Sequence, residues 1–151
     1  MTTYALNGLG RIGILALRPL LERGAKIACL NDAGGDAEMH AQLLEFDTVH
    51  GRWPASFGFD AEAITIDGTR LPIFNARDTA NLPLDGVDVV IDCNGVFKTE
   101  AKLQPYFDAG VKKVVVSAPV KDGPTANIVM GVNDDTYAPA RHRIETAASC
   151  T

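Results

Sequence analysis

The 151-residue sequence has little cysteine and no excess of basic charge, and each shortage excludes a class of protein. Its three cysteines, Cys29, Cys93 and Cys150, are too few and too widely spaced for a disulfide framework. No Cys-x-x-Cys or His-x-x-x-His spacing occurs, so we expect no metal site. Lys and Arg number 14 against 19 Asp and Glu, a net charge of −5. This balance argues against a nucleic-acid partner and against binding to an anionic membrane surface.

Long hydrophobic runs are also missing. No stretch approaches the roughly 18 apolar residues of a membrane-spanning helix. Residues 1–4 lack the charged region and apolar core of a secretory signal, so we expect a cytoplasmic protein. The composition, 46% hydrophobic and 22% charged, is that of an ordinary globular chain and excludes a disordered or collagen-like one. The length suits about one domain with a real core.

Short apolar runs alternate with amphipathic segments along the chain. Strand-length apolar runs predict strands at 4–6, 25–30, 87–93, 113–117, 127–130 and 143–146. Helical spacing predicts helices at about 10–23, 36–46 and 99–109. We expect Asp36 and Thr99 to be N-caps and Pro19 to kink or shift the first helix.

The middle of the chain carries a hairpin signal. Residues 63–66 and 71–74 are alternating runs that flank Asp67-Gly68, a favoured two-residue turn. The whole order therefore predicts an α/β fold, a doubly wound, mostly parallel Rossmann-type sheet with an antiparallel hairpin excursion in the middle.

A G-x-G-x-x-G pattern at residues 8–13 joins the first expected strand to the first helix. Gly8 permits the tight turn, Gly10 lets a pyrophosphate approach the backbone, and Gly13 lets helix and strand pack closely. The N–H groups that open the helix favour phosphate. The alternative is a plain glycine-rich turn without a ligand.

Asp32 ends the second expected strand, 19 residues beyond Gly13. A carboxylate there can accept hydrogen bonds from a ribose 2′-OH and repels a 2′-phosphate, which favours NAD. The small residues 33–35 leave room for an extra phosphate, so NADP is possible as a weaker or dual ligand. The alternative role for Asp32 is that of a helix cap.

Cys150 follows the last expected strand among small polar residues. If a helix begins there, its dipole would lower the thiol pKa, and the thiolate would be a nucleophile for an aldehyde carbon. The alternative, a small buried thiol, is the commoner fate of a cysteine. Cys29 and Cys93 lie in or at the end of expected strands, and we interpret both as ordinary packing residues.

Six segments, in order, resemble phosphorylating glyceraldehyde-3-phosphate dehydrogenase over essentially the whole chain. They are residues 7–13 (Asn-Gly-Leu-Gly-Arg-Ile-Gly), 31–32 (Asn-Asp), 46–51 (Phe-Asp-Thr-Val-His-Gly), 117–119 (Ser-Ala-Pro), 129–133 (Val-Met-Gly-Val-Asn) and 148–151 (Ala-Ser-Cys-Thr). The last looks like the opening of that family's catalytic signature.

The resemblance implies a covalent mechanism. The Cys150 thiolate adds to glyceraldehyde 3-phosphate, hydride passes to NAD to leave a thioester, and phosphate releases an acyl phosphate. It also implies these site residues: Asn7, Arg11 and Ile12 at the glycine loop and pyrophosphate, Asp32 at the adenosine ribose, Arg77, Asn94, Gly95 and Ser117 along the cofactor, and Ser149 and Thr151 at a phosphate oxygen. Ile14, Asn94 and Ala147 depart from the family pattern.

The family's chain is roughly twice this length. The resemblance therefore implies that residues 1–149 are a dinucleotide-binding domain. Residues 150–151 would be the first of a catalytic domain absent from this chain, which alone would have little or no activity. The full-length form is expected to be a homotetramer. Residues 103–108 and 139–142 look more like the bacterial arsenate-resistance paralogue, in which arsenate replaces phosphate and an acyl arsenate forms.

Two other functions remain open. One is a stand-alone dinucleotide-binding or redox-sensing module without catalysis, with Cys150 as an oxidisable thiol. The other is a related aldehyde dehydrogenase that forms acyl phosphates on other substrates.

Overall fold

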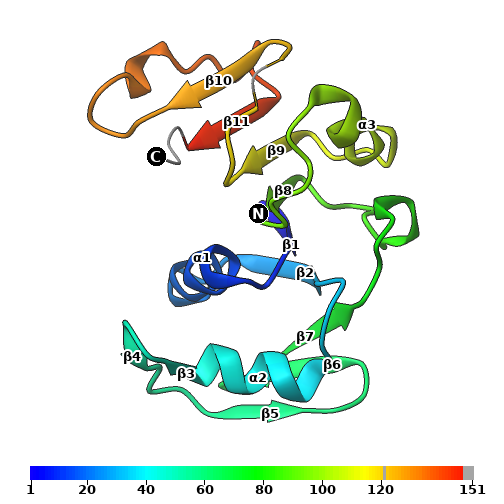
Figure 1. The fold of residues 1–151 in the computed structure, drawn as a ribbon, viewed down its shortest axis with the longest axis vertical. Helices are drawn as coiled ribbons and strands as arrows, with labels where there is room; N and C mark the ends of the chain where they lie inside the picture. The colour runs from blue at the N-terminus through cyan, green and yellow to red at the C-terminus, as the bar shows by residue number, and fades with distance from the viewer. Residues whose placement is uncertain (121, 148–151) are drawn as a thin grey trace.

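The computed structural model, which describes residues 1–120 and 122–147, is built around a mixed β-sheet with helices on both faces (Figure 1). The helices are α1 (Arg11–Glu22), α2 (Ala37–Glu45) and α3 (Glu100–Asp108), with short 3-10 turns η1 (Thr79–Asn81) and η2 (Asp134–Thr136). The strands of the sheet are β1 (Thr3–Asn7), β2 (Lys26–Asn31), β5 (Phe57–Phe59), β6 (Ala63–Ile66), β7 (Thr69–Phe74), β8 (Val89–Asp92), β9 (Lys113–Val116), β10 (Thr125–Ile128) and β11 (Ile144–Ala147). A separate antiparallel pair is formed by β3 (Phe46–Asp47) and β4 (Gly51–Arg52).

The order of the strands sets which face each helix covers. The sheet runs β10-β11-β9-β8-β1-β2-β7-β6-β5, and β1 pairs in parallel with both β2 and β8. The chain steps from β1 through α1 to β2 in one direction, and from β8 through α3 to β9 in the other. Since such crossovers are right-handed, α1 and α3 lie on opposite faces, as Figure 1 shows. The strand order reverses between β1 and β8, and ligands of doubly wound sheets bind at this switch point.

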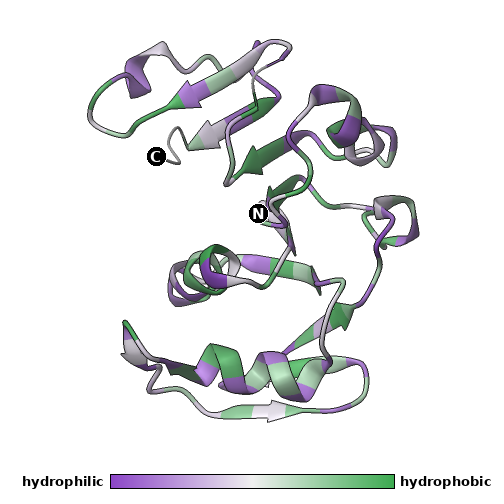
Figure 2. Ribbon diagram, in the orientation of Figure 1, coloured by the Kyte–Doolittle hydropathy of each residue, from purple (hydrophilic) through white to green (hydrophobic). Residues whose placement is uncertain are grey.

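Each face of the sheet has its own hydrophobic core. Neighbouring residues on one strand point to opposite faces, so Leu6 packs with α1 and α2, whereas Ala5 packs with α3. The first core includes Leu17, Leu30, Leu44, Ile64 and Leu71, and the second includes Val90, Leu103, Tyr106, Val114 and Val116. Figure 2 shows β9 as strongly hydrophobic, and its residues Val114 and Val116 are buried in the second core.

The sequence-based fold prediction is confirmed, and the structure refines its details. The 63–74 hairpin forms as β6 and β7 around Asp67 and Gly68, which have φ values of 47° and 79°. Strand β7 also pairs in parallel with β2, so the hairpin extends the main sheet, a connection that the sequence did not indicate. The three-residue strand β5 was too short to predict, and β10 begins two residues earlier than expected.

Local signals at the helix ends behave as predicted. An Asp36 carboxylate oxygen accepts a 2.9 Å hydrogen bond from the Met39 N–H, and the Thr99 hydroxyl accepts one of 3.4 Å from the Lys102 N–H. Pro19 lies inside α1, which continues to Glu22. Among the helices described, none has both the length and the apolar character needed to cross a membrane.

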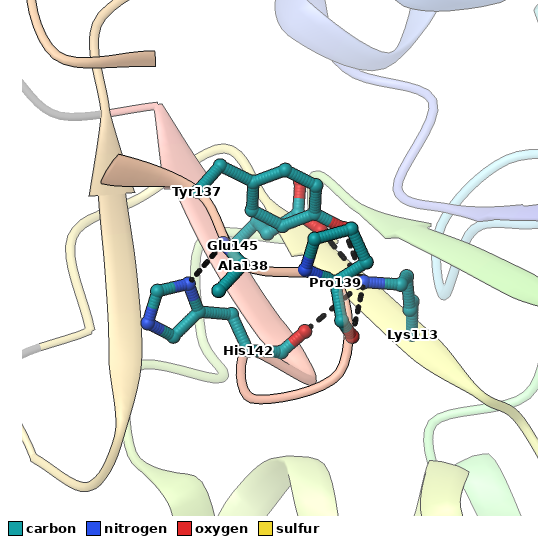
Figure 3. A network of polar contacts seen from close by, with 6 residues as sticks. All are labelled: Lys113, Tyr137, Ala138, Pro139, His142 and Glu145. Carbon is teal, nitrogen blue, oxygen red and sulfur yellow. Dashed lines mark hydrogen bonds and ion pairs between the residues drawn. The ribbon is translucent and has the colours of Figure 1, made fainter. Parts of the chain in front are cut away.

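A lysine anchors the irregular connection between β10 and β11. Lys113 begins β9, and Figure 3 shows its ammonium group inside the 137–142 loop. There it bonds the Tyr137 hydroxyl and the carbonyl oxygens of Pro139 (3.3 Å) and His142 (3.1 Å), and it lies 3.5 Å from the Glu145 carboxylate. It also lies 4.7 Å from the centre of the Tyr137 ring. One cation thus fixes a crossover that has no long helix.

Candidate functional site

A cavity of about 560 Å³ opens where β1, β2 and β8 end, at the switch point of the sheet. Its lining residues come from the loops after these strands and after β7: Asn7, Gly8, Gly10, Asp32, Ala33, Gly34, Ala76, Arg77, Cys93, Asn94, Val96 and Phe97. The position and the lining agree with the crevice expected for a dinucleotide.

The glycine loop forms the floor of this cavity, and two of its glycines are required by close packing. Gly8 has a φ of 99°, and a Cβ there would lie 2.5 Å from the carbonyl carbon of Cys93. A Cβ at Gly13 would lie 1.8 Å from the Gly8 oxygen. At Gly10 nothing lies within 4 Å of the Cβ position. The space over Gly10 is therefore open to a ligand, as the pyrophosphate prediction requires.

Helix α1 begins beside that open space without a side-chain cap. Its N-cap residue is Gly10, and its first turn contains no acidic residue. Arg11 and Ile12 are exposed there. The backbone N–H groups and the positive end of the helix dipole can therefore interact with an anion.

Asp32 connects the end of β2 to the glycine loop. One carboxylate oxygen accepts a 2.7 Å hydrogen bond from the Leu9 N–H, and the other accepts one of 2.9 Å from the Gly34 N–H. The following loop is held by the Asn75 amide, which donates to the Asp32 and Gly35 carbonyl oxygens. The ring of buried His40 lies 2.7 Å from the Gly34 carbonyl oxygen, so helix α2 also supports this loop.

The opposite wall of the cavity is the loop after β8. The Asn94 side-chain oxygen accepts hydrogen bonds from the N–H groups of Val96 (2.7 Å) and Phe97 (3.1 Å), which shape this loop. Cys93 contributes to the wall, but burial raises the pKa of its thiol. Burial likewise raises the pKa of Cys29, to about 11. Neither thiol has the thiolate character of a reactive cysteine.

Beneath the cavity lies a buried polar network centred on Asp92, which ends β8. One carboxylate oxygen accepts from the Tyr106 hydroxyl (2.7 Å), the Asn94 amide (3.0 Å) and the Asn7 amide (3.3 Å). The Asn7 amide also donates to the Tyr106 oxygen at 2.5 Å. Burial of Asp92 raises its pKa to about 6, although these hydrogen bonds oppose the shift.

The network continues from Asn7 to the other rim of the cavity. The side-chain oxygen of Asn7 accepts a 2.7 Å hydrogen bond from the side-chain amide of Asn31. Asn31 in turn bonds both the N–H and the carbonyl oxygen of Ala76, each at 2.9 Å. Ala76 and the adjacent Arg77 line the cavity. The loop after β8 and the loop after β7 are thus connected through four buried or partly buried side chains, those of Asn94, Asp92, Asn7 and Asn31.

The structure brings six of the residues predicted from the sequence into the lining of the cavity, and five others lie outside that lining. Asn7, Gly8, Gly10, Asp32, Arg77 and Asn94 line the cavity. Arg11, Ile12, Gly13, Gly95 and Ser117 are not among its lining residues. The residues predicted for chemistry, Cys150, Ser149 and Thr151, lie outside the described residues.

Sequence reasoning missed several residues of the site. Asp92, Tyr106 and Asn31 were not singled out as site residues, and Ala76, Val96 and Phe97 were not expected in the cavity wall. The available signal was the acidic residue that closes the apolar run of β8, because a charge there needs partners. In the described residues, no group of three or more His, Cys, Asp or Glu side chains could hold a metal ion.

Residues 2–100 match the family described as glyceraldehyde 3-phosphate dehydrogenase, NAD binding domain. The chain is also similar to curated proteins of that name. It is 46% identical over 153 aligned residues to glyceraldehyde-3-phosphate dehydrogenase 3 of Nostoc sp., covering 97% of this chain and 44% of that protein. It is 43% identical to the Streptomyces coelicolor enzyme, with the same coverage of both proteins. A cytosolic enzyme of Scenedesmus vacuolatus is 40% identical, with 96% of this chain and 47% of that protein covered. The chain thus spans a little under half the length of these relatives.

Proposed function

Because the chain belongs to the family of the glyceraldehyde 3-phosphate dehydrogenase NAD-binding domain, we propose that it is the cofactor-binding half of that oxidoreductase. The reaction is the conversion of glyceraldehyde 3-phosphate, NAD and an inorganic oxyanion to an acylated oxyanion and NADH. The observation that carries this proposal is the hydrogen bond between the Leu9 N–H and the Asp32 carboxylate. It places the acidic residue against the glycine loop, beside an open cavity.

Each part of the crevice has a role in binding the dinucleotide. The open backbone at Gly10 and the start of α1 receive the diphosphate bridge. The Asp32 carboxylate accepts hydrogen bonds from the adenosine ribose. Arg77 and the Asn94 loop flank the remainder of the cofactor. When bound, NAD supplies the hydride acceptor, and the chain's residues fix its orientation.

The cofactor preference follows from the charge of Asp32. A 2′-phosphate on the ribose would meet this carboxylate, so NADP is expected to bind more weakly than NAD. Gly34 and Ala33 add little side-chain bulk beside Asp32, which leaves NADP as a weaker or dual ligand.

Catalysis requires a nucleophile, which we assign to Cys150. Its sulfur would form a bond to the aldehyde carbon, and loss of hydride to NAD would leave a thioester. An oxygen of inorganic phosphate would then attack the thioester carbon and release the thiolate. Ser149 and Thr151 are proposed to bind a phosphate oxygen. If the attacking oxyanion is arsenate, the product is an acyl arsenate.

The protein's wider organisation is also part of this proposal. In a protein of the relatives' length, residues 1–149 would form the dinucleotide-binding domain, and Cys150 would begin the catalytic part. We propose that such a full-length protein is a cytoplasmic homotetramer.

Titration calorimetry of the 151-residue chain with NAD and NADP tests the cofactor proposal. We expect binding of NAD and weaker binding of NADP, and a chain that binds neither would contradict it. An assay of NADH formation with glyceraldehyde 3-phosphate and phosphate tests the proposed division of labour. We expect the chain alone to give little or no NADH, since it spans a little under half the length of its relatives. Near-normal turnover would show that the chain is more than a cofactor half.

A further inference from the structure

The buried carboxylate of Asp92 is chemically unusual for its location. The side chain is 1% exposed, and the partners that bond it in the described residues are all neutral: Asn7, Asn94 and Tyr106. A buried carboxylate without a cation costs stability compared with a neutral side chain of the same shape. Four hydrogen-bond donors nevertheless converge on it. This arrangement points to a role of the carboxylate other than stabilising the fold.

Each of these donors also belongs to the wall of the cavity or to its support. Asn94 bonds Asp92 through both its backbone N–H (3.3 Å) and its side-chain amide (3.0 Å), so the carboxylate fixes the point where the 93–97 loop leaves β8. Asn7 ends β1 directly before Gly8, and the Gly8 N–H donates to the Asn31 carbonyl oxygen at 2.7 Å. The same carboxylate therefore supports the loop on one side and the glycine turn on the other.

The direction of the hydrogen bonds along this network depends on the carboxylate being an acceptor. Asp92 accepts from the Asn7 NH₂ group, which leaves the Asn7 oxygen to accept from Asn31. Asn31 can then bond the Ala76 carbonyl with its second N–H and the Ala76 N–H with its oxygen. Protonation would turn one of the two carboxylate oxygens into a donor, so the four donors that converge on Asp92 could no longer all find an acceptor. Protonation would thus disturb both rims of the crevice.

We propose that Asp92 is a positioning residue for dinucleotide binding, which in its ionised form holds the Asn94 loop and the Asn7–Asn31–Ala76 chain in the geometry that receives the cofactor. This inference rests on the proposed function, since it assigns the same crevice to NAD. Asp92 does not itself line the cavity, and it acts through Asn94 and Asn7.

A pH dependence follows from this role. Burial raises the Asp92 pKa to about 6, so the ionised form is lost as pH falls through that value. The titratable groups that face Asp92 are Tyr106 of α3 and Cys93 at the end of β8, and Cys29 of β2 lies near Tyr106. Burial raises the pKa of all three, so they stay neutral near pH 6. The NAD affinity of the wild-type chain should therefore fall as pH is lowered through about 6.

The experiment is calorimetric titration of NAD between about pH 5 and 8 with the wild-type chain and with Asp92→Asn, Tyr106→Phe and Asp88→Asn. We expect Asp92→Asn to bind NAD about tenfold more weakly at neutral pH, the effect of losing one charge-assisted hydrogen bond, and to lack the fall near pH 6. Asp88→Asn is the matched control. It removes a carboxylate just before β8, at the opposite end of the strand from Asp92, and it should keep the wild-type affinity and profile.

Tyr106→Phe provides a readout that a merely structural role would not give. The Tyr106 hydroxyl lowers the Asp92 pKa, so its removal should move the midpoint of the affinity profile to higher pH. An unchanged midpoint in Tyr106→Phe, or a wild-type affinity and profile in Asp92→Asn, would overturn the inference while leaving NAD binding intact. A wild-type chain that binds no NAD at any pH would instead overturn the proposed function and this inference with it. If Asp92→Asn does not fold, the pH profiles of NAD affinity for the wild type and Tyr106→Phe still test the inference.

Discussion

The Leu9 backbone N–H donates a 2.7 Å hydrogen bond to the Asp32 carboxylate, so the glycine loop and the end of β2 are held by one charged contact. The second carboxylate oxygen is bonded by the Gly34 N–H. Asp32 is therefore fixed in orientation before any ligand arrives. Pre-organisation of this kind reduces the entropy lost on binding.

Replacing Asp32 with Asn should weaken NAD binding and reduce discrimination against NADP. The amide keeps the shape but loses the charge that accepts from the ribose hydroxyls, and one of its two polar atoms can no longer accept from the Leu9 or Gly34 N–H. We expect a loss of about 1.5–3 kcal/mol, or about tenfold or more in affinity. Calorimetry with both cofactors measures the change. Asp36→Asn is the control, because Asn caps helix α2 as well as Asp does and should leave both affinities unchanged. Equal loss of NAD and NADP binding in Asp32→Asn would contradict this role.

Alanine substitutions at Gly8 and Gly10 should separate folding from binding. Gly8→Ala places a Cβ against the Cys93 backbone at a φ of 99°, and we expect it to destabilise the fold by several kcal/mol. Gly10→Ala has open space and should cost about 1 kcal/mol or less at the N-cap, yet weaken NAD binding because Gly10 lines the crevice and a methyl group there would take up space for the ligand. Urea unfolding and NAD titration of both variants give the comparison. Normal NAD binding by Gly10→Ala would show that the pyrophosphate does not approach there.

The adjacent lysines Lys112 and Lys113 should differ sharply in their contribution to stability. Lys113→Met removes the cation that bonds the 137–142 loop, and we expect a loss of about 2 kcal/mol in the free energy of unfolding. Lys112→Met removes an exposed pair with Asp88 and should change it by about 0.5 kcal/mol or less. Urea unfolding measures both. Equal effects would show that the Lys113 cluster does not support the β10–β11 connection.

Ionisation of Asp92 should lower the free energy of unfolding but raise the affinity for NAD. Because the Asp92 pKa is about 6 in the folded chain and 3.8 is its ordinary value, the folded state binds this proton more tightly than the unfolded state. Stability therefore falls as pH rises from about 4 to about 6, by about 3 kcal/mol, and stays lower above that. Urea unfolding of the wild type relative to Asp92→Asn should show this fall.

Asp88 is a control in which the dependence of stability on pH should have the opposite sign. Hydrogen bonds from Lys112 and from the Thr3 N–H lower its pKa, so its contribution to stability is present at neutral pH and is lost in acid. Relative to Asp88→Asn, the wild type should therefore gain stability as pH rises. Parallel pH trends for the two comparisons would contradict the assignment of the buried carboxylate.

The sequence predicted those parts of the site whose signals are local. The spacing of Gly8, Gly10 and Gly13, and the acidic residue after the second strand, are visible within 25 residues of chain. The fold class followed for a similar reason, because buried parallel strands and capped helices carry their own patterns. The family resemblance extended these signals to positions such as Arg77 and Asn94, which the structure places in the cavity wall.

The parts that escaped prediction depend on contacts between distant segments. Asn7 and Asp92 are 85 residues apart, and Tyr106 contacts both from helix α3, which packs on the face of the sheet where their side chains lie. Nothing in the local pattern pairs them. The joining of β7 to β2 was missed for the same reason, since a hairpin signal does not say which neighbouring strand the hairpin meets.

The two ends of the sheet affect how chains of this kind can associate. Its outermost strands, β5 and β10, are only three and four residues long. A strand added by another molecule would gain few backbone hydrogen bonds at either border. Association between chains would then depend on side-chain contacts between their faces rather than on pairing of the edge strands. Substitutions on those faces, and not in β5 or β10, would control it.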